Sequence, residues 1–480
     1  MRPHLTLDEL HALDKATLIA MFVQMAEQME ALKRELAIMA ATLAKCQGQL
    51  ALNSTNSSKP PSSDGLNKPK PKPKSLRQSG KRDSGGQPGH PGKTLCQVAE
   101  PDHVEQHGPA PQCDACGLML HAEVVQVRQV FDLPAQRHEV TEHQLMQAQC
   151  PCGKVHRGVF PAGVVAPVQY GPHVLAAAAY LNQHQMLPQQ RSAELLGEMC
   201  GLPMSAATVQ MATQRVQGQV TPVVLAIRQA LLDLPVLNAD ESGLRVNKLL
   251  QWLHVACTDT LVWMARHAKR GKEAFDALKL LTQYRGVLVH DGWQPYRDLV
   301  CLHALCNAHH LRELLFLAEE LKQSWAWEMS DLLRLACHEV NASPEAVLTA
   351  SRLEHFSGEY TRILDAAERE HPRAPPQPGK RGRPKQTLAA NLLRRLREHT
   401  QDVWRFASHA LVPFTNNAAE QLMRMVKVKL KIAGTFRTEA GADTFCTIRS
   451  YLATMVRQGH SAFECLALVL QGQTPQPRFI

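Results

Sequence analysis

No run of apolar residues in the sequence is long enough to span a membrane. The longest, Val174 to Leu181, is far shorter than the roughly 20 residues that a membrane helix requires. The first residues, Met1 to Glu9, lack the uninterrupted apolar core of a signal peptide. We therefore expect no membrane partner.

The cysteines do not form the even, closely spaced set of a disulfide framework. There are 13 of them, an odd number, scattered over 480 residues. This distribution is typical of a protein from a reducing compartment. Together with the missing signal sequence, it predicts a cytoplasmic location.

The chain is too long for one ordinary domain, and its 44% of hydrophobic residues can build several cores. The net charge of +9 is concentrated in segment 59–93, where nine basic residues outnumber two aspartates. This segment also lacks large apolar residues and alternates Pro with Lys, which favours an extended backbone along phosphates. Lys70, Lys72 and Lys74 are its candidate DNA contacts. The alternative is a solvated spacer.

The first segment carries a heptad pattern of apolar residues. Their spacing alternates between four and three, with a mean of about 3.5, which is the repeat of a left-handed coiled coil. The residues are Leu18, Phe22, Met25, Met29, Leu32, Leu36, Met39, Leu43, Cys46 and Leu50. The pattern predicts pairing with another copy of the chain. A single amphipathic helix packed on its own domain is the alternative.

Two close pairs of cysteines enclose a strand-rich span. They are Cys113 and Cys116, then Cys150 and Cys152. Four thiolates complete a closed tetrahedral shell around a structural Zn²⁺, and a glycine follows each pair, where a tight turn needs a residue without Cβ. His138 or His156 could replace one thiolate. Unrelated buried or redox cysteines are the alternative.

Residues 190–216 predict a short helix, a turn at Gly201 and a second helix with Ser205 as its N-cap. This is the arrangement of a helix-turn-helix that reads DNA. A helical hairpin that binds nothing has the same pattern, so both interpretations stay open.

Two apolar strands end in an aspartate. Val236-Leu-Asn-Ala precedes Asp240, and Gly286-Val-Leu-Val-His precedes Asp291. Carboxylates at the ends of neighbouring strands can converge, and their hard oxygens suit Mg²⁺. Two such ions stabilise the attacking and leaving oxygens of a phosphodiester displacement. By itself the pattern is weak, because Asp also caps turns and helices.

A third acid, Glu420, follows Asn416 and Asn417, which can cap its helix. The segment beyond it contains no further acid before Glu439, and its cations predict a surface that holds DNA phosphates beside the metal. They are Arg424, Lys427, Lys429, Lys431 and Arg437. The alternative is a solvated basic helix whose glutamate forms a salt bridge.

These motifs together resemble the large transposase of the insertion-sequence-66 family of bacterial mobile elements. The resemblance covers nearly the whole chain. Its motifs are, in order, the heptad, Asn53-Ser-Thr-Asn-Ser-Ser-Lys-Pro-Pro-Ser-Ser-Asp-Gly, the cysteine pairs, Asp240-Glu-Ser-Gly, His290-Asp-Gly-Trp, Cys306-Asn-Ala-His309 and Asn416-Asn-Ala-Ala-Glu420. The last of these, together with the basic segment that begins at Lys427, is the most specific.

The resemblance implies a multidomain α/β protein with a ribonuclease-H-like catalytic domain. Asp240 would lie on its first strand, Asp291 on its fourth and Glu420 on a later helix, as an Asp-Asp-Glu site for two Mg²⁺ or Mn²⁺ ions. The expected units are a coiled-coil helix (1–52), a basic linker (53–94), a zinc-ribbon-like unit (95–165), a helical DNA-binding unit (166–234), the first part of the catalytic core (235–312), a helical insertion (313–412) and the second part of the core (413–480).

The implied activity is cleavage of transposon ends, followed by transfer of the freed 3′-hydroxyl ends into target DNA. The partners would be the terminal inverted repeats, the target DNA, a second copy of the chain and accessory proteins of the same element. Two other classes stay open. One is a catalytically inactive DNA-binding protein derived from a transposase, and the other is a ribonuclease-H-like nuclease that cuts but never joins ends.

Two smaller features have open roles. Arg381 and Arg383, in a basic break within the insertion, predict either a hook that enters the DNA minor groove or a charged surface loop. A group of potential ligands follows the expected fifth strand: His303, Cys306, His309 and His310. We expect packing rather than a second zinc site there, with an active-site contact from His309 as the sharper alternative.

Overall fold

The computed structural model describes residues 14–51, 97–373, 384 and 386–479, apart from 108, 120, 122 and 132–137. The predicted DNA contacts Lys70, Lys72, Lys74, Arg381 and Arg383 lie outside these residues. The chain forms two compact units. The smaller one comprises Lys72–Gln169 and Ala193–Ser205, and the larger one Met1–Pro71, Tyr170–Ser192 and Ala206–Ile480.

Residues 15–51 form one long helix, α2 (Lys15–Ala51). Asp14 precedes it, and its carboxylate accepts hydrogen bonds from the backbone N–H groups of Ala16 and Thr17 at 2.8 and 2.9 Å, as an N-cap does. The described heptad side chains are all exposed, from 37% at Leu18 to 71% at Phe22. An apolar seam left uncovered within one chain favours the predicted coiled coil.

Residues 172–233 are largely helical, as the sequence predicts. The elements are α3 (Pro172–Ala179), the π-helix η2 (Tyr180–His184), α4 (Gln189–Cys200) and α5 (Ala206–Asp233). Gly201 ends α4 with a φ of 62°, a left-handed conformation that favours glycine. The N–H of Leu202 then donates to the carbonyl of Leu196 at 3.3 Å. The predicted helix end is therefore confirmed, and DNA contact by these helices stays a prediction.

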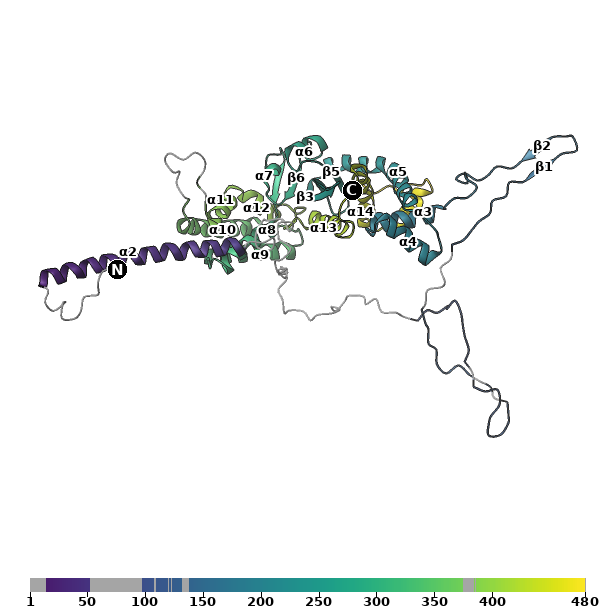
Figure 1. Cartoon of the computed structure of the whole chain (residues 1–480), viewed down its shortest axis with the longest axis horizontal. Helices are drawn as coiled ribbons and strands as arrows, with labels where there is room; N and C mark the ends of the chain where they lie inside the picture. The colour runs from purple at the N-terminus through teal and green to yellow at the C-terminus, as the bar shows by residue number, and fades with distance from the viewer. Residues whose placement is uncertain are drawn as a thin grey trace. The chain divides into compact units, whose positions relative to one another are not determined.

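A five-stranded mixed sheet forms the centre of the larger unit (Figure 1). Its strands are β3 (Val236–Val246), β4 (Leu249–Cys257), β5 (Val262–His267), β6 (Val287–His290) and β7 (Leu302–Leu305). They lie in the order β5-β4-β3-β6-β7. The first three in the chain are antiparallel, while β6 and β7 run parallel to β3. β6 pairs with the first residues of β3, so Asp291, which follows β6, lies beside Asp240. The prediction that the first strand ends at Asp240 is wrong, because β3 continues to Val246 and pairs there with β4.

Helices fill the connections of the sheet. α6 (Lys272–Leu278) lies between β5 and β6, and α7 (Gln294–Arg297) between β6 and β7. Five helices then follow β7: α8 (Asn307–Glu319), α9 (Ser324–Ala342), α10 (Ala350–Glu370), α11 (Leu388–Glu398) and α12 (Thr400–Ser408). They share one apolar core with β6 and β7, which includes Val289, Leu314, Leu333 and Tyr360. This block corresponds to the predicted insertion, although α8 begins before residue 313.

Three helices end the described part of the chain: α13 (Asn417–Ala433), α14 (Glu439–Arg457) and α15 (Ala462–Leu470). Of these, α13 and α14 pack on the sheet, and α15 packs on α3, α5 and α14. Side chains of α13 and α14, such as Met423 and Phe445, share a core with Leu244 and Val255 of the sheet. The edge strand β5 is also closed by α14, because the N–H of Met264 donates to Ser450 Oγ at 2.8 Å. None of the helices in the described ranges has the length and apolar character to cross a membrane.

Candidate active site and zinc-binding turns

Two of the predicted acids lie side by side, at the edge of the sheet that forms where β6 ends. Asp240 is part of β3, and Asp291 directly follows β6. These strands are parallel neighbours, with Asn238 opposite Val289 in their register. Asp240 Oδ1 accepts a hydrogen bond from the N–H of Glu241 at 2.9 Å, and Asp291 Oδ1 one from the N–H of Trp293 at 2.8 Å. Each carboxylate therefore keeps its second oxygen for another partner.

The third acid, Glu420, reaches this edge from the first turn of α13. The preceding Asn416 is 1% exposed and fixes the start of the helix against β3. Its Nδ2 donates to the carbonyl of Ala239 at 2.8 Å, and its Oδ1 accepts from Nδ2 of Asn238 at 2.9 Å. Because Ala239 is next to Asp240, these contacts bring the start of α13 to the two aspartates.

The charges of these acids act on one another. Burial raises the pKa of Asp240 well above its usual value, and the charges of Glu241, Asp291 and Glu420 raise it further. A carboxyl group whose ionised form is disfavoured by burial and by its neighbours is typical of functional sites. Divalent cations bound by hard carboxylate oxygens would offset this concentration of negative charge. The donor set therefore fits Mg²⁺.

Glu420 has other partners in the structure. Its Oε1 lies 3.4 Å from His309 Nε2 and 3.9 Å from Arg312 Nη2, and the thiol of Cys306 donates to it at 3.9 Å. The hydrogen bond with His309 lowers the pKa of Glu420, and burial opposes this effect. In the described part of the chain, the group of three potential ligands within 4.8 Å of one another is Cys306, His309 and Glu420. The three predicted acids do not form such a group among the described residues.

The neighbouring acid Glu241 already has strong partners. Arg270 Nη2 lies 2.6 Å from its Oε1, and the hydroxyl of Tyr296 donates to its Oε2. Burial raises the pKa of Glu241 to about 7, the charge of Asp291 adds to the rise, and Arg270 opposes it. Because side chains alternate along a strand, Glu241 and Asp240 face opposite sides of β3. Glu241 is therefore a structural acid rather than a further ligand.

Arg270 is itself held by two aromatic rings. Its guanidinium lies 3.9 Å from the ring centroid of Trp293 and 4.9 Å from that of Trp252. Such cation–π contacts stabilise a partly exposed guanidinium. Trp293 directly follows Gly292, whose φ is 84°. The stack therefore anchors the turn that carries Asp291.

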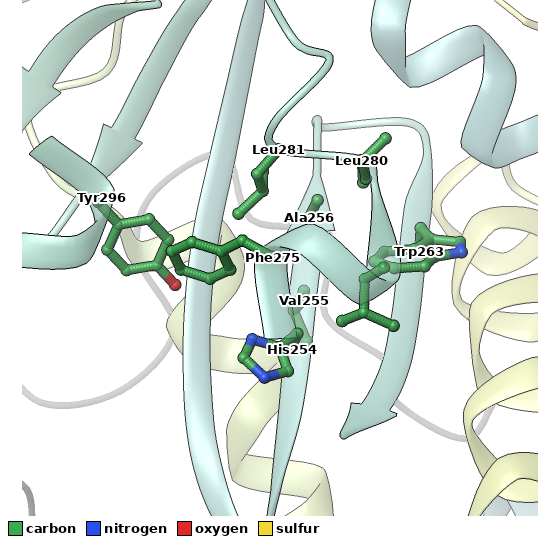
Figure 2. Close-up of a pocket in the computed structure, with 9 residues that line it drawn as sticks. His254, Val255, Ala256, Trp263, Phe275, Leu280, Leu281 and Tyr296 are labelled. Atoms are coloured by element: carbon green, nitrogen blue, oxygen red, sulfur yellow. The ribbon is translucent and has the colours of Figure 1, made fainter. Parts of the chain in front are cut away.

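A small apolar pocket lies on the Tyr296 side of the sheet (Figure 2). Tyr296, Phe275 and His254 line it in succession, with ring centroids 5.1 and 5.9 Å apart, and Leu281 and Trp263 complete the wall. Burial lowers the pKa of His254 to about 4, so this ring is neutral at physiological pH. No carboxylate lines the pocket. It supports Tyr296 and offers no acidic ligand.

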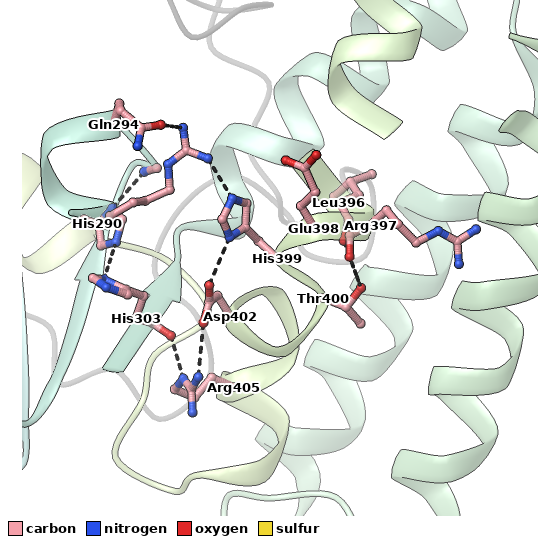
Figure 3. Close-up of polar contacts among 12 residues, drawn as sticks. His290, Gln294, His303, Leu396, Arg397, Glu398, His399, Thr400, Asp402 and Arg405 are labelled. Atoms are coloured by element: carbon pink, nitrogen blue, oxygen red, sulfur yellow. Dashed lines mark hydrogen bonds and ion pairs between the residues drawn. The ribbon is translucent and has the colours of Figure 1, made fainter. Parts of the chain in front are cut away.

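A polar network connects the strand of Asp291 to the helical block (Figure 3). The N–H of Gly292 donates to His290 Nδ1 at 3.0 Å, so Nε2 of this ring carries its proton and donates to His303 Nδ1 at 3.2 Å. Arg405 Nε donates to the carbonyl of His303, and its Nη2 donates to Asp402 Oδ1 at 3.1 Å. The network thereby fastens the ends of β6 and β7 to α12.

The second group of potential ligands is divided by the structure. His303 contacts His290, and His310 is 4% exposed with its Nδ1 3.1 Å from Asn307 Oδ1. Packing, as we expected, describes these two residues. His309 instead contacts the candidate catalytic residue Glu420, which agrees with the alternative of an active-site contact.

The predicted basic surface of α13 needs one correction. Arg424, Lys431 and Arg437 are exposed, while Lys427 is half-buried. Burial lowers the pKa of Lys427, and the charges of Asp240 and Glu420 oppose this effect. Lys429 is 9% exposed, and its Nζ donates to the carbonyls of Asn182 and Met186 at 3.3 and 3.5 Å. Lys429 is therefore not part of an exposed basic surface, because its ammonium group is buried against η2 and the turn that follows it.

Both cysteine pairs occupy tight turns in the smaller unit. The N–H of Gly117 donates to the carbonyl of Cys113, and that of Gly153 to the carbonyl of Cys150, each at 2.8 Å. The two glycines have φ values of 70° and 87°, as the predicted turns require. Hydrogen bonds from backbone N–H groups lower the pKa of Cys113 and of Cys152. Donor groups that favour thiolates fit a structural Zn²⁺.

The two pairs are not brought together within ligand distance, since the four sulfurs are absent from the clusters found among the described residues. The second pair lies in the turn between β1 (Gln147–Gln149) and β2 (Val155–Arg157), which pair antiparallel. The first pair lies in a turn closed by an antiparallel bridge between Gln112 and Met119. His138 instead contacts the carbonyl of Cys200 through its Nδ1, at 3.1 Å.

Comparison with known protein families agrees with these features. Residues 167–444, which include the sheet and all three candidate acids, match the IS66 family of transposases. Residues 111–153, which include both cysteine pairs, match the zinc-finger binding domain of transposase IS66, and residues 6–95 match a family of unknown function. No curated protein matches the chain. The family matches imply a DNA-binding enzyme of the nuclease and transposase type, with a zinc finger, and the chain belongs to the IS66 transposase family.

Proposed function

We propose that this protein cleaves the ends of a transposon and joins their 3′-hydroxyl groups to target DNA, with Asp240, Asp291 and Glu420 as its catalytic acids. The observation that carries the proposal is the convergence of their charges on Asp240, whose pKa is raised. The three residues come from β3, the end of β6 and the start of α13, so only the fold brings them together.

The order of the strands supports a ribonuclease-H-like catalytic domain. β3 and β6 are the first and fourth strands of the sheet in chain order, and they are adjacent in space. This order supports the positions that the resemblance implies for the two aspartates. Helices α8–α12 stand between β7 and α13, where an insertion is expected.

Asp240, Asp291 and Glu420 would hold two Mg²⁺ or Mn²⁺ ions. Bound in this way, such ions supply charge stabilisation for the attacking and leaving oxygens of phosphodiester displacement. The chain's own residues position the reactants. Asn416 holds the start of α13 at Ala239, and Lys427, with the exposed Arg424, can bind a DNA phosphate beside the acids.

The other parts would select and pair the DNA ends. The thiolates of Cys113, Cys116, Cys150 and Cys152 would hold a structural Zn²⁺ in a unit that recognises the terminal inverted repeats. The exposed apolar seam of α2 would pair two copies of the chain. Two copies, with or without accessory proteins of the element, can bridge two transposon ends.

The test is a joining reaction with purified protein, labelled transposon-end DNA, a supercoiled target and Mg²⁺. Asp240→Asn, Asp291→Asn and Glu420→Gln should each reduce joined product by at least about 10²-fold. Asp259→Asn is the matched control, because Asp259 is exposed in the turn between β4 and β5 and should keep wild-type activity. Full activity of the Glu420 variant would remove it from the site. Cleavage without joining would favour the nuclease, and binding without cleavage the inactive DNA-binding protein.

A further inference from the structure

Three potential ligands of different chemistry meet beside the proposed catalytic acids. Cys306 precedes α8, His309 lies in its first turn, and Glu420 comes from the first turn of α13. One ligand atom of each lies within 4.8 Å of the other two. We propose that these three side chains form a second metal site, which binds a transition-metal ion such as Zn²⁺.

The distances between the ligand atoms agree with a tetrahedral zinc site. Usual zinc–ligand bond lengths at tetrahedral angles place a nitrogen and an oxygen ligand about 3.4 Å apart, and a sulfur and an oxygen ligand about 3.6 Å apart. His309 Nε2 and Glu420 Oε1 are 3.4 Å apart, and Cys306 Sγ and the same oxygen are 3.9 Å apart. Small side-chain rotations are sufficient to complete the site, and its fourth position stays open for water or a DNA oxygen.

Cys306 is buried, and its sulfur already accepts a backbone hydrogen bond. The N–H of Asn416 donates to its Sγ at 3.1 Å, as backbone N–H groups also do to sulfur in the cysteine turns of the smaller unit. Cys306 is the N-cap of α8, and the positive end of the helix dipole favours negative charge on a bound sulfur there. In the structure the thiol of Cys306 carries the proton that it donates to Glu420 Oε1. A coordinated ion displaces that proton.

The ligand types also determine which ion is bound. Thiolate and imidazole prefer Zn²⁺, whereas Mg²⁺ prefers carboxylate oxygens. The site is therefore distinct in selectivity from the pair of aspartates, with Glu420 common to both. Zinc binding by itself does not depend on the proposed function. Its consequence does: while Zn²⁺ holds Glu420 at Cys306 and His309, this carboxylate is withheld from Asp240 and Asp291.

The experiment counts zinc bound per chain after equilibrium dialysis of the full-length protein. We expect two equivalents for wild type, one for Cys306→Ser, one for His309→Ala and one for Cys113→Ser/Cys116→Ser. The matched control is Cys446→Ser, because Cys446 is an equally buried thiol in α14 and should leave the count at two.

Circular dichroism shows whether each variant folds. If Cys306→Ser does not fold, the zinc content of His309→Ala tests the proposal. One equivalent in wild type, or an unchanged count in the folded Cys306 or His309 variant, would overturn the proposal. The measurement requires no DNA cleavage, so its failure is distinguishable from failure of the proposed catalytic function.

Discussion

The side chains of Asn416 and Asn238 are hydrogen-bonded to each other, with Nδ2 of Asn238 donating to Oδ1 of Asn416 at 2.9 Å. Both residues are buried, and Asn416 also donates to the backbone of β3 at Ala239. This pair connects the helix of Glu420 to the strand of Asp240. The position of the third acid therefore depends on an amide and not on a charge.

Replacement of Asn416 by Ala should reduce both stability and activity. It leaves the Asn238 amide without its partner, which should cost about 1–3 kcal/mol in the free energy of unfolding, measured with urea. Misplacement of Glu420 by about 1 Å should reduce strand transfer by about 10²-fold. Asn417→Ala is the control, because the Asn417 side chain is exposed. Equal activity of the two variants would show that Asn416 does not position the acid.

Asp240→Asn should stabilise the Mg²⁺-free protein while it abolishes activity. The pKa of Asp240 in the folded protein is raised by burial and by three acidic neighbours. The protonated carboxyl group therefore makes its full contribution to the stability of the fold below about pH 3.9, the pKa of Asp in an unfolded chain. That contribution is lost as the pH rises through the raised pKa, because the unfolded carboxyl ionises freely. Without Mg²⁺, the melting temperature of the variant should therefore exceed that of the wild type, and the difference should grow from pH 5 to pH 8. A variant less stable than wild type at every pH would contradict the electrostatic account.

Arg270→Ala should destabilise the fold through Glu241, whose side chain is 1% exposed and would lose its cation. Loss of one partner of a buried pair costs about 3–5 kcal/mol, and we expect about 2–3 because 32% of the Arg270 side chain is exposed. Addition of Glu241→Gln should recover part of the loss in a double-mutant cycle measured by urea unfolding. Additive effects of the two substitutions would mean that the ion pair is not the cause.

Lys427 and Lys429 should respond in opposite ways to alanine substitution. Lys427→Ala should weaken binding of transposon-end DNA and reduce its salt dependence, with little change in stability. Lys429→Ala should lower the free energy of unfolding by about 1–3 kcal/mol, because two buried carbonyl groups lose their donor. Fluorescence anisotropy at several salt concentrations and urea unfolding measure the two effects. A loss of DNA affinity in a folded Lys429 variant would reverse our correction.

The sequence predicts the strands beside Asp240 and Asp291 because a short apolar run precedes each acid. It does not predict that β3 continues beyond Asp240 to Val246, because that half of the strand is held by pairing with β4. It also predicts the end of the helix at Gly201 and the turns at the cysteine pairs, because a glycine with positive φ determines the local structure there. Helical geometry accounts for the error at Lys429. Lys427 and Lys431 are four residues apart and share a face of α13, whereas Lys429 lies on the other side of the helix.

Contacts between distant segments could not be predicted from local patterns. The pair of Asn416 with Asn238 and the contact of Glu420 with His309 join segments that no periodicity relates. His303, Cys306, His309 and His310 are close in sequence, but the turn from β7 into α8 directs them to different partners. His303 lies in β7 and packs against His290, whereas His309 lies at the start of α8 and contacts the candidate catalytic Glu420.

The central claim is that Asp240, Asp291 and Glu420 share divalent cations, and iron-mediated backbone cleavage tests it most directly. Fe²⁺ replaces Mg²⁺ in the DNA-bound protein, and ascorbate with peroxide then generates radicals that cut the chain near the bound metal. We predict cuts near residues 240, 291 and 420 together, suppressed by excess Mg²⁺ and absent from Asp240→Asn. Cuts at only one of these segments, or cuts that persist unchanged in the Asp240 variant, would contradict a shared site.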